Sequence, residues 1–289
     1  MYIYDSCHKA IQSCLMTKTF SVAHLYNMEK TMDMHIHDCC EIYYSISGGK
    51  QFLINNHLYS FQPGDIFFID QCESHHIAQI DDEIHERYVL NIHPEYLRHF
   101  SNARTNLGQC FDAASHPSGH RLSLSLQEQQ RFLYLIHKLA STTAEFGQEL
   151  LEQASFLELM VFFNELFLSK RHQSSEKPEF SGKYYEKTAD ILTYINQNLA
   201  NNLNIAALSE HFSLSASYLS MIFKKETGTT IQKYITGQRI ALAKKLLSEG
   251  HSVTDTFTLC GFGDYSNFLK TFTRTVGISP KKFSQFSLE

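Results

Sequence analysis

The chain of 289 residues lacks any apolar run that approaches the ~20 residues a membrane-spanning helix needs. Its first residues, Met-Tyr-Ile-Tyr-Asp, lack the basic start and apolar core of a secretory signal. Its seven cysteines lack any Cys-x-x-Cys spacing, and an odd number does not suit a disulfide framework. These absences predict a cytoplasmic protein with reduced thiols and no membrane partner.

The chain also lacks net positive charge, since its formal net charge is −5 at pH 7. Residues 1–182 carry 13 Lys and Arg against 22 Asp and Glu, a balance of −9, and 14 of the 16 histidines. Residues 183–289 carry 12 against 8, a balance of +4. The length suits two domains that each bury a core. The division of charge predicts that these domains have different roles.

The first half has the pattern of a β-structure from about residue 20 to residue 93. Turn residues such as Gly48-Gly49 and Asn55-Asn56 separate short apolar segments. The expected strands are 42–47, 50–55, 58–61, 66–69, 76–80 and 87–92. Many short strands between turns predict a barrel or jelly roll, followed by an irregular stretch at 101–123.

Two amphipathic helices are expected after the barrel, at 126–146 and 149–168. The apolar surface of the second helix is wider than one stripe, which suits contact with both the barrel and a partner. We therefore expect one of these helices to contribute to a homodimer as well. The polar stretch 169–182, broken by Pro178 and Gly182, has the composition of a linker.

The C-terminal part has an all-helical pattern with two helix-turn-helix units in tandem. The expected helices are 184–199, 205–212, 216–227, 230–248, 253–260, 266–275 and a last one that begins at Pro280. Asn204, Ser215 and Ser252 stand where N-caps are required. The corner at Ser213-Leu214 is short enough for a helix-turn-helix. The helix at 230–248 would rise ~28 Å, which approaches one DNA turn of ~34 Å.

This part of the chain closely resembles the AraC/XylS family of transcription regulators. The resemblance covers about 184–286, and three segments carry most of it: 218–228 (YLSMIFKKETG), 239–247 (RIALAKKLL) and 261–280, which begins GFGDYSNFLKTF and ends GISP. It implies an α+β chain of two domains. Residues 1–168 would form a cupin-like effector-binding and dimerisation domain, a jelly-roll barrel with two flanking helices. Residues 169–182 would form the linker, and 183–289 an all-α double helix-turn-helix.

In the family, the exposed early faces of both recognition helices meet base edges in successive major grooves. By position, the resemblance nominates Ser217, Ser220 and Met221 in the first helix, and Tyr265, Ser266, Asn267 and Lys270 in the second. Asn267 would suit adenine and Lys270 guanine, whereas Met221 offers only apolar contact with a thymine methyl. Helical spacing predicts that Leu219, Ile222, Phe223, Phe262, Phe268 and Phe272 are core.

Basic residues near these helices are candidates for phosphate contacts, which position a protein without specifying sequence. They are Lys224, Lys225, Arg274, Lys281 and Lys282. The alternative for each is an ordinary solvated surface. The first recognition helix contains no arginine.

The segment His35-Ile36-His37-Asp38-Cys39-Cys40-Glu41 carries a pattern suited to a metal site. On a strand, positions i, i+2 and i+6 share a face, so His35, His37 and Glu41 would project together. His75 from a neighbouring strand would complete three imidazoles and one carboxylate, a set suited to Zn, Fe, Mn or Ni. His76 should face away from them. The spacing resembles the first motif of the cupin barrel.

Three interpretations of this cluster remain open from the sequence. The four residues hold a divalent metal, or together with Tyr43 they line a metal-free effector pocket, or they are ordinary barrel histidines. In AraC-like sensor domains this pocket usually binds a small effector, often a sugar, and needs no metal. Phe52 and Phe68 are further candidates for a sugar-stacking surface, or plain core. Cys39, Cys40 and Cys72 form either a redox sensor or, as we expect, a set of buried inert thiols.

The sequence therefore predicts a DNA-binding transcription regulator, an activator, that responds to a small effector such as a sugar or related metabolite. Its expected partners are double-stranded DNA, the effector, a second copy of the chain and RNA polymerase. No cofactor is required and no catalytic residue is expected. The alternatives are a metal-dependent cupin enzyme fused to a DNA-binding module, or a metal-responsive regulator.

Overall fold

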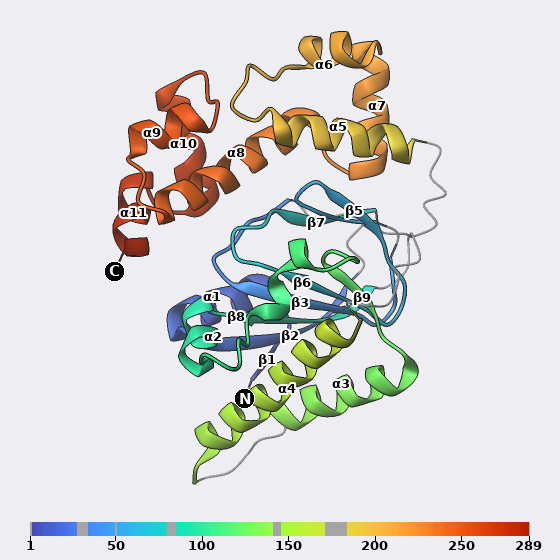
Figure 1. The fold of residues 1–289 in the computed structure, drawn as a ribbon, viewed down its shortest axis with the longest axis vertical. Coiled ribbons are helices and arrows are strands. Elements are labelled where there is room, and N and C mark those ends of the chain that lie inside the picture. Colours follow the sequence, from blue (N-terminus) through green and yellow to red (C-terminus); the bar gives the residue numbers. More distant parts are fainter. Residues whose placement is uncertain are drawn as a thin grey trace.

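A computed structural model of the chain describes residues 2–27, 34–49, 51–79, 85–140, 146–170 and 184–288. The first domain contains two β-sheets, as expected for a jelly-roll barrel (Figure 1). The larger sheet has the strand order β1-β2-β8-β3-β6-β9. Its strands are β1 (Ile3–Tyr4), β2 (Phe20–Asn27), β3 (Cys40–Ser45), β6 (Asp65–Ile69), β8 (His85–Ile92) and β9 (Arg121–Ser123).

The smaller sheet has the order β5-β4-β7, with β4 (Gln51–Ile54), β5 (His57–Ser60) and β7 (His75–Gln79). A two-residue turn at Asn55-Asn56 joins β4 to β5, and Asn55 has a left-handed backbone with φ 50°. Asparagine tolerates this conformation, which a tight hairpin turn requires. The turn was predicted correctly, whereas residues 50 and 80 of the expected strands lie outside the described residues.

Both faces of the larger sheet are buried. Along β3, Ile42 and Tyr44 pack with one hydrophobic cluster, while Tyr43 between them packs with another. All six residues of β3 are buried. Because β3 is covered on both sides, Ile42, Tyr43 and Tyr44 form an apolar run rather than an alternating pattern.

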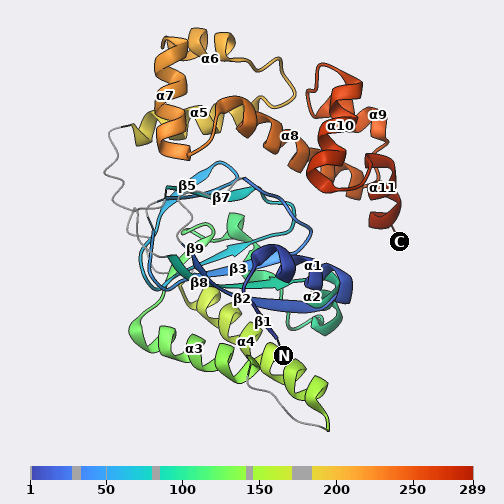
Figure 2. The ribbon, with the colours of Figure 1, turned by 180° about the vertical axis from the view of Figure 1, so that it is seen from behind.

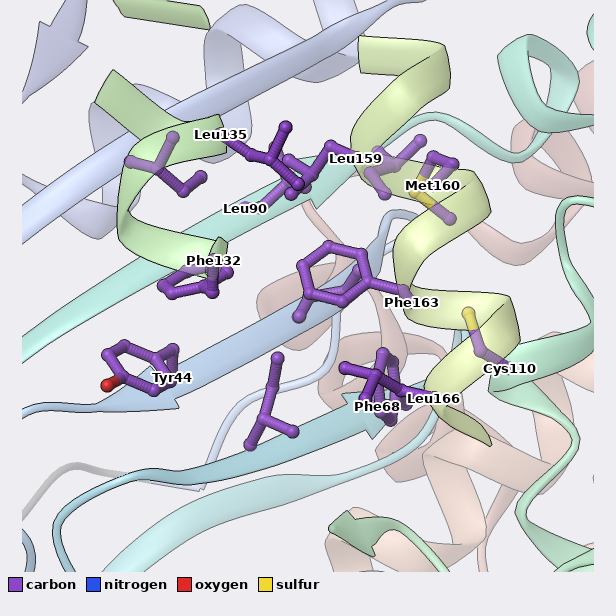
Figure 3. Close-up of a cluster of buried hydrophobic side chains, with 14 of the residues drawn as sticks. Tyr44, Phe68, Leu90, Cys110, Phe132, Leu135, Leu159, Met160, Phe163 and Leu166 are labelled. Carbon is purple, nitrogen blue, oxygen red and sulfur yellow. The ribbon is translucent and has the colours of Figure 1, made fainter. Parts of the chain in front are cut away.

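Two helices cover the outer face of the larger sheet, α3 (Leu126–Ala140) and α4 (Gln148–Lys170). Phe132 of α3 and Phe163 of α4 meet Phe68 and Tyr44 of the sheet in this core (Figure 3). Phe68 is thus core between sheet and helices. Helix α4 extends two residues beyond the boundary predicted at 168, because Ser169 and Lys170 continue its last turn. Residues 141–145 and 171–183, which include most of the expected linker, lie outside the described residues.

Several further elements of the first domain were not predicted. Helix α1 (Cys7–Thr17) packs against β2, and α2 (Pro94–Phe100) follows β8. The stretch expected to be irregular contains two short 3-10 helices, η1 (Gln109–Phe111) and η2 (Ala113–Ser115), besides β9. The periodic patterns of such short helices and strands are too weak to identify them from sequence.

The second domain is helical throughout its described residues. It consists of α5 (Tyr185–Gln197), α6 (Ile205–Phe212), α7 (Ala216–Thr227), α8 (Ile231–Ser248), α9 (Val253–Leu259), α10 (Tyr265–Val276) and α11 (Pro280–Leu288). The predicted caps are present: the side chains of Asn204, Ser215 and Ser252 accept hydrogen bonds from the backbone N–H of the third residue on. The α+β fold with a sheet-rich first domain and a helical second domain is therefore confirmed.

The helical domain packs against the smaller sheet of the barrel (Figures 1 and 2). Leu53 of β4 and Leu58 of β5 belong to the same buried cluster as Ile191 of α5 and Phe223 of α7. Helix α8 begins over this sheet and runs outward to α9, α10 and α11, as both views show. The barrel thus lies directly beside the first helix-turn-helix unit.

Candidate DNA-binding helices and a histidine cluster

The first helix-turn-helix unit consists of α6 and α7. Ser213, with φ 53°, ends α6, and the Ser215 hydroxyl accepts from the N–H of Tyr218 at the start of α7. The three candidate base-contacting residues of α7, Ser217, Ser220 and Met221, are all exposed. Their side chains are therefore accessible to a DNA groove.

The second unit consists of α9 and α10. Gly261 lies in the corner between them with φ 72°, where a Cβ would overlap the carbonyl oxygen of Leu199. Asp264 caps α10 by accepting from the N–H of Asn267 at 2.6 Å, a cap that sequence inspection missed. A short acidic residue directly before the first residue of the recognition helix was the available signal. The candidates Tyr265, Ser266, Asn267 and Lys270 are exposed.

The residues predicted as core are separated from these exposed faces. Leu219, Ile222, Phe223, Phe268 and Phe272 have 0% exposure. Phe262 is half-buried, and the guanidinium of Arg239 lies 5.9 Å from its ring centroid. Both recognition helices therefore use their apolar face for packing and leave the polar one open.

The predicted phosphate contacts are also exposed, namely Lys224, Lys225, Arg274, Lys281 and Lys282. The ammonium group of Lys225 lies 5.2 Å from the centroid of the Tyr184 ring. Each of these cations can reach solvent, as a phosphate contact requires. Their role stays a prediction, as does that of the base-contacting residues.

Helix α8 joins the two units through 18 residues, a rise of roughly 27 Å. Arg239 fastens it to the loop before α6 by donating to the carbonyl oxygens of Leu199 and Asn201. A continuous helix held at its middle fixes the separation of the two recognition helices. The arrangement suits successive major grooves.

In the barrel, His35, His37, Glu41 and His75 come together as predicted. One ligand atom from each residue lies within 4.8 Å of all the others. A carboxylate oxygen of Glu41 lies 3.0 Å from Nε2 of His37 and 3.6 Å from Nε2 of His75. Ligands bound at about 2.0–2.2 Å to one zinc-sized ion would lie roughly 3–4 Å apart. The described donor set therefore fits a divalent transition metal.

Hydrogen bonds orient two of these imidazoles toward the centre of the cluster. Nδ1 of His37 lies 3.0 Å from the carbonyl oxygen of Cys39, and Nδ1 of His75 lies 2.9 Å from that of Glu73. Each Nδ1–H donates to a carbonyl, so that each Nε2 points at the Glu41 carboxylate, to which it can donate a proton or, once deprotonated, share a metal ion. Metal-binding histidines are commonly oriented in this way.

The electrostatics of the cluster keep its carboxyl group ionised. Burial by itself would raise the pKa of Glu41, but the imidazoles of His75 and His37 outweigh burial and hold this pKa well below its usual value. Burial would lower the pKa of His75, whereas the Glu41 carboxylate raises it above its usual value. The positive charge that His75 gains therefore compensates the buried Glu41 carboxylate, and a bound cation can take over this compensation.

The interior beside the cluster is filled by aromatic side chains. Tyr43, predicted to line an effector pocket, packs its ring 5.0 Å from that of Phe52, which lies 6.3 Å from the ring of His75. Tyr43 and Phe52 are 3% and 2% exposed. In this structure Tyr43 is therefore part of the barrel core, one ring away from the cluster.

A cavity of about 1550 Å³ lies elsewhere, between the barrel and α5. Tyr59, Glu73 and His120 line it on the barrel side, and Tyr185 and Thr193 on the helical side. The imidazole of His120 connects the Glu73 carboxylate, at 3.1 Å, to the Tyr59 hydroxyl, at 2.8 Å. None of the four cluster residues lines this cavity.

Two local expectations need correction. Residues 36–39 do not form a strand, because β3 begins only at Cys40. His35 instead pairs with His75 through an isolated antiparallel bridge, which brings the cluster residues together. Strand alternation would also place Cys39 between His37 and Glu41, but its Sγ atom lies 3.3 Å from that of Cys14 in α1, so Cys39 does not stand between these residues.

His76 does face away from the cluster, but its role was missed. Its Nε2 donates to the carbonyl oxygen of Thr227 at the end of α7, over 2.6 Å. Strand alternation predicted only that His76 points away from the cluster. The sequence offered no sign of its partner Thr227, 151 residues away.

Two helix-turn-helix units on one connecting helix, joined to a barrel, define a transcription regulator with a separate sensing domain. The model of the AraC-like ligand binding domain matches residues 19–160, and the model of a helix-turn-helix domain matches residues 208–285. Together these matches cover most of the chain. The chain belongs to the AraC family of transcription regulators, which bind DNA and small-molecule effectors.

Its relatives include the transcriptional activator RhaS of Escherichia coli O139:H28, 27% identical over 252 residues, which are 87% of each chain. The transcriptional activator RhaR of the same strain is 24% identical over 253 residues, 86% of each chain. A crystal structure of ToxT from Vibrio cholerae O395 covers 94% of this chain and 100% of its own, with 14% identity and a TM-score of 0.37. Among the described helices, none is long and apolar enough to span a membrane.

Proposed function

We propose that this chain activates transcription by placing α7 and α10 in successive major grooves of double-stranded DNA. The supporting observation is that both helices are capped, expose their polar residues and are joined by a continuous α8. In α10, the Asn267 amide would pair with adenine and Lys270 would donate to guanine. In α7, Ser217 and Ser220 would donate single hydrogen bonds, and Met221 would contact a thymine methyl.

Selection of binding sites from random DNA by the full-length protein tests this function. We expect two recurrent sequence blocks spaced by about one helical turn of 10–10.5 base pairs. A promoter that carries the selected site should then be activated when the protein is expressed. Binding with no sequence preference would contradict the proposal.

We propose that the effector in the barrel is a divalent transition metal held by His35, His37, Glu41 and His75. The favourable features are four convergent ligand atoms, two imidazoles oriented by carbonyl oxygens and an ionised carboxylate. When bound, the ion would supply a fixed positive charge at the centre of this set. The ring-filled interior beside it favours an ion over a larger molecule.

Metal analysis of protein purified without chelator, followed by zinc titration of DNA affinity, tests this site. We expect stoichiometric metal, and Glu41→Gln should weaken zinc binding at least tenfold, because the variant removes the ligand charge. Protein that neither retains nor binds a divalent metal would contradict the proposal. Stoichiometric metal with no effect on DNA binding would instead favour the alternative function, a metal-dependent enzyme fused to a DNA-binding module.

An organic effector is the second candidate, and the cavity beside α5 favours it. Glu73, His120 and Tyr59 offer hydrogen-bonding groups there to a hydroxylated compound such as a sugar. Because a ligand that binds only the folded state must stabilise it, a thermal-shift screen of sugars tests this candidate. A sugar that stabilises the wild type but not His120→Ala would support the cavity as its site.

The outer face of α4 supports a homodimer. Leu150, Val161 and Leu168 are 63%, 43% and 41% exposed and recur at helical spacing along this 23-residue helix. We propose that this face pairs with its copy in a second chain, and that the dimer works with RNA polymerase in the cytoplasm, where its DNA is. Val161→Glu should shift the protein toward monomer in analytical ultracentrifugation, whereas Glu165→Gln on the same face should not.

A further inference from the structure

The four cluster residues lie on two short segments that meet each other. His35, His37 and Glu41 belong to residues 34–41, and His75 begins β7. The backbones of His35 and His75 exchange two N–H···O hydrogen bonds, of 3.2 and 3.1 Å. Any change in the spacing of the ligands therefore moves both segments.

The first segment also contacts α8. Asp38, between two ligands in the sequence, pairs with Lys244 at 2.6 Å, and the Lys244 side chain is only 2% exposed. Ile36, between His35 and His37, packs against the core of the second helix-turn-helix unit. The segment thus directs histidines toward the cluster and intervening residues toward the DNA-binding domain.

The second segment contacts both α7 and α8. Ser74 accepts a hydrogen bond from Gln238 of α8 at 2.6 Å, and His76 donates to the Thr227 carbonyl at the end of α7 at 2.6 Å. His75 lies between these two residues and faces the cluster. Neighbouring residues of a strand point to opposite sides, so one short backbone serves both sites.

Asn55 reinforces this connection from the β4–β5 turn. Its amide N–H donates to the Ser74 carbonyl at 2.7 Å, and its own carbonyl accepts from Tyr234 at 3.0 Å and from Gln238 at 3.3 Å. We call these contacts of Asp38, Asn55, Ser74 and His76 with α7 and α8 the interdomain interface. No contact of this interface uses a ligand side chain, yet three of its four barrel residues adjoin a ligand in the sequence.

We propose that metal binding at the cluster and docking of α7 and α8 on the barrel are coupled, so that a bound divalent ion stabilises the docked arrangement; this rests on the proposed metal site. With the four ligands held at fixed distances, the backbones of residues 34–41 and 73–77 lose freedom. Asp38, Ser74 and His76 are then held in the positions that α7 and α8 require. Coupling of two sites is reciprocal, so docking must strengthen metal binding by the same factor.

Reciprocity allows a test from the DNA-binding side that leaves every barrel residue unchanged. Zinc affinity is measured by calorimetry on full-length wild type, Gln238→Ala and Lys244→Met. Each variant removes an interface contact, and methionine keeps most of the buried lysine stem. We expect zinc affinity to fall about fivefold or more in each. Matched controls on the same helix are Gln232→Ala and Lys245→Met, whose side chains are exposed, and these should bind zinc like the wild type.

Hydrogen exchange provides a second measurement that does not depend on a variant folding well. In wild type, zinc should slow amide exchange at the end of α7 and in the first half of α8. In Lys244→Met the same zinc occupancy should slow it less. Two results would together overturn the coupling: amide exchange in α7 and α8 that does not change at saturating zinc, and zinc affinity that does not change in either interface variant. The metal site itself would remain supported. Wild type that does not bind zinc would overturn the metal site itself.

Discussion

The two helix-turn-helix units of this protein differ in what holds them and in what they present to DNA. The first unit lies against the barrel: Thr227 accepts from His76, and the buried Glu226 accepts from Gln51 over 3.1 Å. The second unit lies at the outer end of α8, and its core includes one partly buried barrel residue, Ile36. Control by the barrel therefore acts most directly on the first unit.

The exposed side chains of the two recognition helices favour the second unit, whereas contact with the barrel favours the first. Helix α7 offers two serines and Met221 to bases, whereas α10 offers Asn267 and Lys270, which suit adenine and guanine. The unit that has fewer contacts with the barrel in the described residues is thus better equipped for base recognition. This division suggests that sequence recognition and regulation are placed in different units, and that α8 connects them.

Removal of one buried aromatic ring from the core of each unit should have the largest effect on stability. It also tests whether the barrel supports the first unit more than the second. Phe268 of α10 and Phe223 of α7 both have 0% exposure, so each change to alanine should cost about 3–5 kcal/mol of stability. Phe223 shares its cluster with Leu53 and Leu58 of the barrel, but Phe268 does not. Phe223→Ala should therefore speed hydrogen exchange in β4 and β5, and Phe268→Ala should leave it unchanged. Equal exchange in β4 and β5 for both variants would show that the two units depend on the barrel alike.

Single contacts to bases would show a smaller effect that sharpens the difference in recognition. Asn267→Ala should cost about 1–3 kcal/mol at one base-pair position. Ser220→Ala removes a single hydroxyl and should cost less. Binding of both variants to a panel of single-base variants of the selected site measures these effects. If Asn267→Ala leaves the sequence preference unchanged, Asn267 does not contact a base. If Ser220→Ala loses more affinity than Asn267→Ala, the first unit contributes more to sequence recognition than the second.

The sequence predicted the second domain more completely than the first. Caps and corners set the helix boundaries locally, so that α6 and α7 begin and end where expected. Asn204 and Ser215 carry this information within three residues of the bonds they make. The spacing also predicted that His35, His37, Glu41 and His75 lie together, although residues 36–39 are not a strand.

What the sequence did not predict depends on contacts between distant residues. His76 was assigned to the outside of the barrel, but its partner Thr227 follows 151 residues later. As residue types, Tyr43 and Phe52 suit either a sugar-stacking surface or a hydrophobic core. Only the packing of their rings against each other shows that they belong to the core. The docking of the two domains likewise depends on long-range pairs such as Asp38 and Lys244, which no local pattern marks.

Phosphate contacts should give the smallest and least specific effect in both units. Lys225→Ala in α7 and Arg274→Ala in α10 each remove one exposed cation, which should weaken binding to every DNA sequence by roughly 1 kcal/mol at physiological salt. Each should also reduce the slope of log affinity against log salt by about 1. Glu210→Gln, an exposed change of the same charge magnitude on α6, should not reduce this slope. The ammonium of Lys225 lies near the ring of Tyr184, just before α5. If Arg274→Ala reduces the salt slope and Lys225→Ala does not, Lys225 packs against Tyr184 rather than contacting DNA.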